Sequence, residues 1–312
     1  MKIVRAEFQD LDDMCQTLRA WDVEFHPLGE IPSKETVGNL IQVIDGDIKY
    51  GYSRFTPGLS MAGTPPEGLV TFNVMEPANR RYWVRGHDVD EGMVWVFPVG
   101  AELRSVSAPG FQVHTLSVAE EQIERVADEL EISLPAPSGR SEVFPIPGRI
   151  LSEVRLYLRE LGQGPVKSLL QSTYEILRLL VPCWLGVNTD GIARGRLIRG
   201  RDVAVRKGLE LIESRNFDHI TMDELVHECS VSERTLQYAF RERFGVSPKK
   251  FIKSIRLAKV RSALSSADAD ADTVGNIASQ LGFWHFGRFA SEYRTAFGEL
   301  PSETLRKSHG SK

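Results

Sequence analysis

The chain carries a run of polar side chains whose types and spacing fit the chemistry of reading DNA base pairs. With a helical repeat, Arg234, Gln237, Tyr238 and Arg241 lie together on the outward face of one segment. Arginine can donate two hydrogen bonds to a guanine edge, glutamine can pair similarly with adenine, and Tyr238 can reach a phosphate or a thymine methyl group. The segment therefore predicts a helix that enters the major groove of duplex DNA.

The same signature occurs a second time, 53 positions further along the chain. The matched pairs are Leu236 with Phe289, Phe240 with Tyr293, Arg241 with Arg294, Phe244 with Phe297, Gly245 with Gly298 and Pro248 with Pro301. Each copy has an apolar face, a glycine that ends the helix and a proline that opens the next one. A unit used twice, each time after a short helix and a turn, predicts two DNA-recognition helices in one small domain.

The second copy offers a different set of outward side chains, and its turn is one residue longer. Its candidates for contact with DNA are His285, Arg288, Ser291 and Arg294, and Lys249 and Lys250 open a long basic helix between the copies. The first copy carries the arginine, glutamine and tyrosine suited to base edges. We therefore expect the first unit to supply most base specificity, and the second to anchor the domain on the DNA backbone or on RNA polymerase.

Local signals place the helix ends in this domain. Thr221 and Glu224 are spaced as a capping box, and Ser232 is placed to cap the first recognition helix. Gly245 is expected to end that helix in the left-handed conformation, and Thr273 to cap the helix before the second turn. From Arg201 onward the pattern predicts seven short helices.

Charge is divided unevenly along the 312 residues. Residues 1–195 contain 18 basic and 27 acidic residues, whereas residues 196–312 contain 20 basic and 15 acidic residues. The overall net charge of −4 therefore hides a basic C-terminal domain on an acidic body. This is the electrostatic pattern expected when only one end of a protein meets phosphate.

Composition argues for a soluble globular protein of about two domains, with 42% apolar and 26% charged residues. No uncharged apolar run approaches the roughly 18 to 20 residues of a membrane span, and the N-terminus does not resemble a signal peptide. Cys15, Cys183 and Cys229 are odd in number and form no close pair. Their number and spacing fit a reducing compartment better than a disulfide framework, and we expect a cytoplasmic protein that does not meet the membrane.

The N-terminal part alternates short apolar stretches with Gly and Pro turn signals. Strands are predicted over residues 40–44, 49–55, 69–74, 93–97 and 111–116. Their spacing of about ten residues argues for an all-β sandwich or barrel in residues 1–132. Ser117 is then expected to cap an amphipathic helix whose apolar face carries Ile123 and Val126.

Residues 133–200 read as linker and dimerisation helices. The prolines between Ser133 and Gly148 predict a loop, and residues 166–181 predict a helix with a broad apolar stripe. The stripe has two interpretations, core packing within the first domain or a dimer interface, and the pattern does not choose between them. Residues 201–312 form the DNA-binding part of this division.

The C-terminal pattern resembles the DNA-binding domain of the AraC/XylS transcription regulators over residues 201–307. The shared signature comprises Gly282, Phe283, Phe289, Tyr293, Phe297, Gly298 and Pro301. The resemblance implies that two recognition helices enter successive major grooves on one face of DNA. It places base contacts at Arg234, Gln237, Tyr238, Arg288 and Ser291. This chain departs from the usual pattern at Ser230, at Gly287 and at the pair Thr304-Leu305.

The resemblance also implies a cupin-like N-terminal domain that senses a small molecule and dimerises. The chain is thus expected to be an α+β two-domain protein: a β-barrel or cupin-like domain with linker helices, then an all-α domain of two helix-turn-helix units. The usual metal-binding pattern of cupins is missing, because His26, His87 and His114 lie far apart, and we expect neither metal nor cofactor.

An aromatic and basic cluster is the sequence candidate for the effector site. Arg81 and Arg85 could grip an anionic ligand, while Tyr82, Trp83 or Trp95 could stack on a ring. The spacing of the two arginines also resembles half of a cyclic-di-GMP signature, whose other half is missing. A charged outer strand face is the competing and favoured interpretation of the same residues.

Three functional hypotheses follow from these patterns. The first is a non-enzymatic, effector-responsive and dimeric transcription regulator that binds promoter DNA and, as an activator, RNA polymerase. The second is a cupin-class enzyme with an attached DNA-binding module. The third is an interaction module whose basic helices bind an acidic protein. Salt-sensitive, sequence-preferring DNA binding distinguishes the first from the other two.

Overall fold

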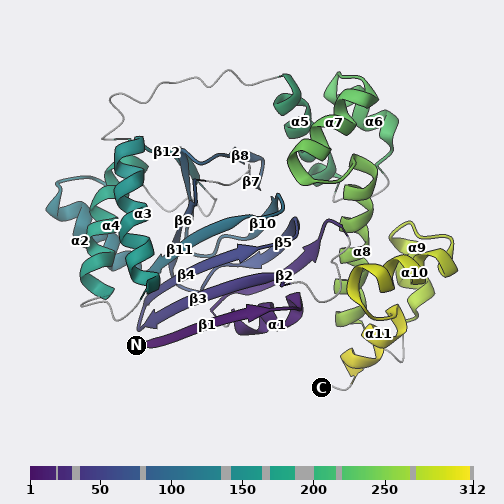
Figure 1. Ribbon diagram of the computed structural model, residues 1–312, viewed down its shortest axis with the longest axis horizontal. Coiled ribbons are helices and arrows are strands. Elements are labelled where there is room, and N and C mark those ends of the chain that lie inside the picture. The colour runs from purple at the N-terminus through teal and green to yellow at the C-terminus, as the bar shows by residue number, and fades with distance from the viewer. Residues whose placement is uncertain are drawn as a thin grey trace. The chain divides into compact units, whose positions relative to one another are not determined.

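The computed structural model describes residues 1–18, 20–29, 36–77, 82–134, 142–163, 169–186, 200–215, 220–267 and 272–309 (Figure 1). The chain divides into two compact units. One comprises Met1–Phe25 and Lys34–Leu197, and the other comprises His26–Ser33 and Ile198–Lys312. Strands with a few helices make up the first unit and helices dominate the second, which confirms the predicted α+β two-domain class.

The strands form two antiparallel sheets rather than one closed barrel in the described residues. The larger sheet has the order β1 (Lys2–Phe8), β3 (Gly38–Asp45), β4 (Ile48–Phe55), β11 (Gln112–Val118), β6 (Val70–Met75), β9 (Met93–Phe97) and β12 (Glu142–Pro145). The smaller sheet has the order β2 (Asp22–Pro27), β5 (Leu59–Thr64), β10 (Leu103–Ser107), β7 (Tyr82–Val84) and β8 (His87–Val89). All five predicted strands are present, with ends that differ by a few residues.

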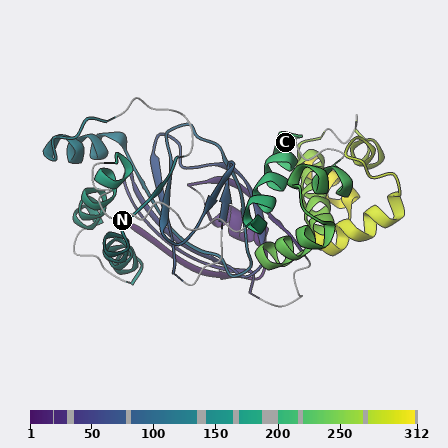
Figure 2. The same cartoon turned by 90° about the horizontal axis from the view of Figure 1, so that it is seen from above.

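The larger sheet is covered on one face by helices. These are α2 (Glu120–Glu129), α3 (Gly148–Gln163) and α4 (Leu169–Trp184), drawn in teal beside the strands in Figure 2, while α1 (Leu11–Thr17) follows β1. Their apolar faces share one core with Tyr50, Phe72 and Leu116 of the sheet. Every residue of β6 is buried, because a strand covered on both faces has no solvent side.

Two local predictions in this unit are wrong. Ser117 does not cap a helix: it lies in β11, where its hydroxyl is 2.8 Å from that of Thr71 on the neighbouring strand. Helix α2 begins at Glu120 after Ala119, which makes no side-chain capping bond. The region predicted as a loop contains β12, which pairs with β9 at the edge of the sheet. Pro145 is tolerated in this edge strand, where the backbone N–H that proline lacks is not needed for pairing. Residues 135–141 lie outside the described residues.

The apolar stripe of α4 is core packing for most of its length. Leu169, Thr173, Ile176, Leu177 and Leu180 are buried against the larger sheet and its other helices. Leu170 is the exception, with 53% of its surface exposed. The helix spans Leu169–Trp184, so it ends later than the predicted residue 181.

A buried polar network joins the larger sheet to α3. The Tyr50 hydroxyl lies 3.0 Å from His114 Nδ1, and His114 Nε2 lies 2.7 Å from Glu76 Oε1. Arg159 of α3 binds the same carboxylate through Nε, at 2.9 Å, and through Nη2. The bonds from Arg159 outweigh burial and, with the bond from His114, lower the pKa of Glu76 to about 2. His114, one of the three separated histidines, is thus structural.

The second unit contains seven helices in the described residues, as predicted. They are α5 (Gly200–Ser214), α6 (Met222–Cys229), α7 (Glu233–Phe244), α8 (Pro248–Ser266), α9 (Val274–Gln280), α10 (Phe286–Phe297) and α11 (Pro301–His309). Figure 1 shows α5, α6 and α7 in green at one end of α8, and α9, α10 and α11 in yellow at the other. No helix among the described residues is long and apolar enough to cross a lipid bilayer.

Replacing Glu76 should make the stability of the chain depend less on pH in the acidic range. The lowered pKa of Glu76 stabilises the fold above about pH 4.5, and this contribution is lost as the pH falls toward about 2. We expect Glu76→Gln to destabilise the first unit by about 2 kcal/mol at pH 7, and the deficit to shrink between about pH 4.5 and 2. Thermal melts of both proteins against pH measure this. Exposed Glu67→Gln is the control, and an equal deficit at every pH would contradict the role of Glu76.

Candidate nucleic-acid interface

The two predicted recognition helices have the same length and the same ends. Helix α7 spans Glu233–Phe244 and α10 spans Phe286–Phe297, so the helices keep the 53-residue offset of the sequence. Gly245 and Gly298 end them with nearly identical left-handed backbone angles, φ 76° and ψ −6° against φ 74° and ψ −6°. A side chain at either position would be strained, so glycine is favoured there.

The predicted caps in front of α7 are present. The Thr221 hydroxyl accepts from the Glu224 backbone N–H at 3.2 Å, and the Glu224 carboxylate accepts from the Thr221 backbone N–H at 2.8 Å. The Ser232 hydroxyl accepts from the Thr235 backbone N–H at 3.2 Å. Between the two helices, Ser230 adopts the left-handed conformation with φ 52°. This is the position where the resemblance leads us to expect glycine.

Helix α7 presents its predicted base readers on the surface. Arg234 and Arg241 are exposed, and Tyr238 exposes 55% of its surface. Gln237 is half-buried, and its amide nitrogen donates to Glu233 Oε1 at 2.9 Å. On the opposite face, Leu236, Phe240 and Phe244 are buried, and the rings of Phe240 and Phe244 pack on Phe251 of α8. The buried face thus fixes which side of α7 is available to DNA.

Helix α10 does not repeat these readers at the equivalent positions. The 53-residue offset places Gly287, Ala290 and Ser291 where α7 has Arg234, Gln237 and Tyr238; only Arg241 has its counterpart, in Arg294. A side chain at Gly287 would meet no atom within 4 Å, so packing does not require glycine there. The exposed side chains at the start of α10 are His285, Phe286 and Arg288, together with Trp284 just before it. The second unit therefore offers a different surface from the first.

The connection before α10 is longer than that before α7. Ser230–Ser232 joins α6 to α7, whereas Leu281–His285 joins α9 to α10. The longer connection carries Gly282 with φ 81°, and it packs Phe283 against Phe289 with ring centroids 4.9 Å apart. Helix α9 has the predicted cap, since the Thr273 hydroxyl accepts from the Asn276 backbone N–H at 3.2 Å. His285 caps α10 without a side-chain hydrogen bond.

A basic groove of about 790 Å³ lies between the two helix-turn-helix units. Its walls come from the start of α6, the first half of α8 and the start of α10. The charged and titratable residues that line it are Lys249, Lys250, Lys253, Arg256, His285, Arg288 and Glu292. Lys249 and Lys250 are exposed and border the same groove as His285 and Arg288. The other two predicted second-unit residues, Ser291 and Arg294, are exposed but do not line it.

One carboxylate in the groove holds two of these cations. Glu292 Oε1 accepts from Lys253 Nζ of α8 at 2.9 Å and from Arg288 Nε of its own helix at 2.9 Å. Burial acts to raise the pKa of the Glu292 carboxyl, but the two hydrogen bonds outweigh it, and the pKa is lowered. Glu292 was not among the residues predicted from the sequence. The spacing of four residues from Arg288 was the available signal.

The departure Thr304-Leu305 is explained by packing beneath α10. The Thr304 hydroxyl lies 2.8 Å from the Tyr293 hydroxyl and donates to Glu299 Oε1 at 2.7 Å. Glu299 is also 3.7 Å from Arg261 of α8. Thr304 is 4% exposed, so these bonds satisfy a buried hydroxyl and join α11, α10 and α8 into one core with Leu305.

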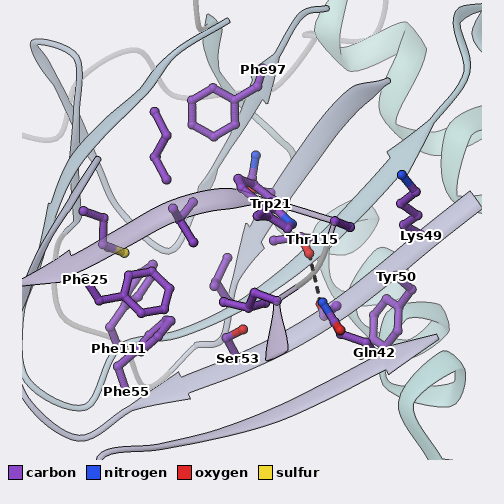
Figure 3. Close-up of a pocket in the computed structure, with 18 of the residues that line it drawn as sticks. Trp21, Phe25, Gln42, Lys49, Tyr50, Ser53, Phe55, Phe97, Phe111 and Thr115 are labelled. Atoms are coloured by element: carbon purple, nitrogen blue, oxygen red, sulfur yellow. Dashed lines mark hydrogen bonds between the residues drawn. The ribbon is translucent and has the colours of Figure 1, made fainter. Parts of the chain in front are cut away.

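The first unit encloses a second candidate site, between its two sheets. Figure 3 shows this cavity of about 60 Å³, with aromatic side chains such as Trp21, Phe25 and Phe97 around it. Its polar lining includes Gln42, Lys49, Ser53, Asn73 and Thr115. Roughly 10 to 15 Å³ suffices for one water molecule, so the cavity must widen to admit a larger ligand.

The predicted effector cluster is only partly at this cavity. Tyr82 and Trp95 line it, whereas Trp83 and Arg85 do not. Arg85 instead lies on the surface, where it donates to the Glu102 carbonyl at 3.3 Å. Arg81 lies outside the described residues. Because neighbouring strand residues face opposite sides of a sheet, a continuous sequence cluster cannot all reach one cavity.

Lys49 is the cavity cation that sequence reasoning missed. It alternates along β4 with Tyr50, which faces the helices, and this period of two was the available signal. The Trp95 indole N–H is buried and has no hydrogen-bond partner among the described residues. In the same residues, no group of three or more His, Cys, Asp or Glu side chains could hold a metal ion.

Comparison with known proteins agrees with the geometry of the second unit. A family described as "Helix-turn-helix domain" matches residues 225–307. The XylDLEGF operon transcriptional activator of Pseudomonas putida is 37% identical over 99 residues, which cover 32% of this chain and 31% of that protein. The XylDLEGF operon transcriptional activator 2 of the same organism is 35% identical over 117 residues, covering 38% of this chain and 74% of that protein.

The chain belongs to the AraC/XylS family of transcription regulators. Proteins of this family are regulators and not enzymes, which argues against the cupin-class enzyme. The match spans about a third of the length of the first relative named above. Among solved structures, the AraC-like transcriptional activator CuxR has a TM-score of 0.45 and 15% identity over 84% of this chain and 96% of that chain.

Replacing Ser230 with glycine should stabilise the second unit. A non-glycine residue in the left-handed region is strained, and glycine there relieves roughly 1 kcal/mol. The Ser230 hydroxyl contributes little, because its contact with the His227 carbonyl is 3.5 Å long. We expect Ser230→Gly to raise the denaturation midpoint of the helical unit. Gly245→Ala, which imposes the reverse change at φ 76°, should lower it, and a shift of the same sign in both variants would contradict this account.

Proposed function

We propose that this protein is a sequence-specific DNA-binding transcription regulator of the AraC/XylS type. The observation that carries the proposal is the pair of matched recognition helices, α7 and α10, joined by α8 with a basic groove between them. Family membership supports it. The α7 readers fit base edges, while the lysines at the start of α8 fit phosphates.

The two kinds of contact should respond differently to mutation. We expect Arg234→Ala to cost about 1 to 3 kcal/mol on the preferred duplex and to relax preference at one position. Lys249→Ala should weaken all sequences alike and reduce the salt slope of binding by about one. Anisotropy titrations on a duplex selected from a random pool, and on a shuffled duplex, measure both. Equal effects of the two changes would sink the role of α7, and an absence of sequence preference would sink the function.

We infer further that the cavity between the sheets is the place where a small effector acts. The cavity is mainly apolar, and its donors include the Lys49 ammonium, which has no ion-pair partner among the described residues, and the unpartnered Trp95 indole. A largely apolar molecule with a carboxylate or another strong acceptor suits this lining. The earlier candidate cyclic-di-GMP fits it poorly, because that ligand is large, polar and doubly charged while the cavity is small and apolar.

Thermal-shift measurements on the full chain test this effector class. We expect some members of a panel of aromatic and aliphatic carboxylates to raise the melting temperature, because a ligand that binds only the folded state stabilises it by mass action. Neutral amide analogues should have weaker effects, and Lys49→Met should abolish the difference. Lys2→Met, at the start of β1, serves as the control. If carboxylates stabilise the Lys49→Met protein as strongly as the wild type, Lys49 has no part in recognition.

We also propose that the protein acts as a cytoplasmic homodimer and, as an activator, contacts RNA polymerase. Leu156 of α3 and Leu170 of α4 support a dimer surface, since each exposes more than half of its area. Sedimentation velocity of the full chain tests this, with Leu156→Glu as the disrupting variant. A single monomeric species at micromolar concentration would refute the dimer. A reporter promoter transcribed equally well without the protein would refute activation.

A further inference from the structure

The carboxylate of Glu292 occupies an unexpected place for a helix meant to meet DNA. Its Oε1 atom binds Lys253 and Arg288 at 2.9 Å each, and its side chain is only 22% exposed. The equivalent position of the first recognition helix is Ala239, which is buried. The second unit thus inserts a negative charge between α10 and α8 where the first unit has only packing.

The negative charge of Glu292 lies among basic side chains. Among the described residues that line the groove it is the one acid, and Lys249, Lys250 and Arg256 lie around it. A carboxylate in a basic groove weakens attraction to any polyanion, whatever its sequence. An acid in this place therefore lowers general affinity, which must be balanced by another effect if the groove serves DNA binding.

Arg288 can gain more from a base than from a phosphate. An exposed ion pair such as Arg288–Glu292 is worth a factor of about five at most. A bidentate bond from arginine to guanine discriminates by a factor of about five to more than a hundred. Exchange of Glu292 for a matched guanine is therefore favourable for Arg288, whereas exchange for a phosphate of an unmatched duplex gains little.

We propose that Glu292 is a positioning residue for discrimination, which holds Arg288 and Lys253 away from phosphate on unmatched DNA and releases Arg288 to a matched base. The proposal rests on the proposed function and adds a mechanism to it. It also gives the second unit a part in specificity, through suppression of non-specific binding rather than through several base readers.

Two substitutions that each remove one negative charge distinguish this role from a general effect of charge. Glu292→Gln keeps the shape of the side chain and removes its charge. Glu210→Gln is the matched control, because Glu210 pairs with Arg206 at the same spacing of four residues on α5, outside the groove, with a distance of 3.7 Å. Both variants and the wild type are titrated at several salt concentrations, on a duplex selected with the wild type and on a shuffled duplex.

We expect Glu292→Gln to bind the shuffled duplex more tightly, with a salt slope steeper by about one to two, as one or two more phosphates are neutralised. Its ratio of specific to non-specific affinity should fall about five- to tenfold, while Glu210→Gln keeps the wild-type ratio. Equal slopes and ratios for the two variants would overturn the proposal. So would a Glu292→Gln protein that is weaker on both duplexes.

A second pair of variants does not depend on how well Glu292→Gln folds. Because Lys253 is already neutralised by Glu292, Lys253→Gln should change the salt slope on the shuffled duplex little, whereas Lys249→Gln should reduce it by about one. Equal losses of salt slope in these two variants would refute the proposal that Glu292 holds Lys253. Elution from immobilised heparin gives the same comparison without any DNA sequence. If the wild type lacks sequence preference, the regulator function fails, and the heparin elution of Glu292→Gln against Glu210→Gln still decides whether Glu292 holds these cations.

Discussion

Helix α8 is the element on which the DNA-binding unit depends, because it belongs to two cores at once. Near its start, Phe251 packs against Phe240 and Phe244 of α7. Near its end, Val260 and Leu264 are buried with Phe289 and Tyr293 of α10 and α9 residues such as Ile277. A single rigid helix with a buried face at each end fixes the separation of the two recognition helices. On the surface of its first half, Lys249, Lys250, Lys253 and Arg256 line the groove.

The two units meet this constraint with different chemistry. The first packs rings against rings and leaves the four predicted readers on the outward face of α7. The second adds polar bonds, in which Thr304 joins Tyr293 to Glu299, and Glu292 joins Lys253 to Arg288. The bonds of Thr304 satisfy a buried hydroxyl, whereas the ion pair with exposed Arg288 gives little net stability; both fix geometry. The asymmetry expected from the sequence repeat thus has a physical counterpart: α7 exposes its predicted readers, while Glu292 of the second unit binds two cations.

The first unit shows a comparable division between two faces of one sheet. Residues of β4 that face the helices, Tyr50 among them, enter the polar network with His114, Glu76 and Arg159. Residues that alternate with them, Lys49, Ser53 and Phe55, border the cavity, which Tyr50 also reaches. The cavity and the network are therefore built from neighbouring residues of the same strand. Only one layer of sheet therefore separates the cavity from α3.

The sequence by itself determined the features that depend on local backbone preferences. The repeat, the capping residues Thr221, Ser232 and Thr273, the glycines that end α7 and α10, and five strands of the larger sheet (β3, β4, β6, β9 and β11) follow from short-range signals and periodicity. Interactions between distant residues were decided only by the tertiary structure. Ser117 lies in a strand beside Thr71, and residues 142–145 form an edge strand of the larger sheet. Of the predicted effector cluster, Tyr82 and Trp95 line the cavity, Trp83 is buried away from it, and Arg85 donates to the Glu102 carbonyl. Glu292 accepts a hydrogen bond from Lys253, which lies 39 positions earlier in the chain. Such contacts depend on which faces are buried together, which no local pattern records.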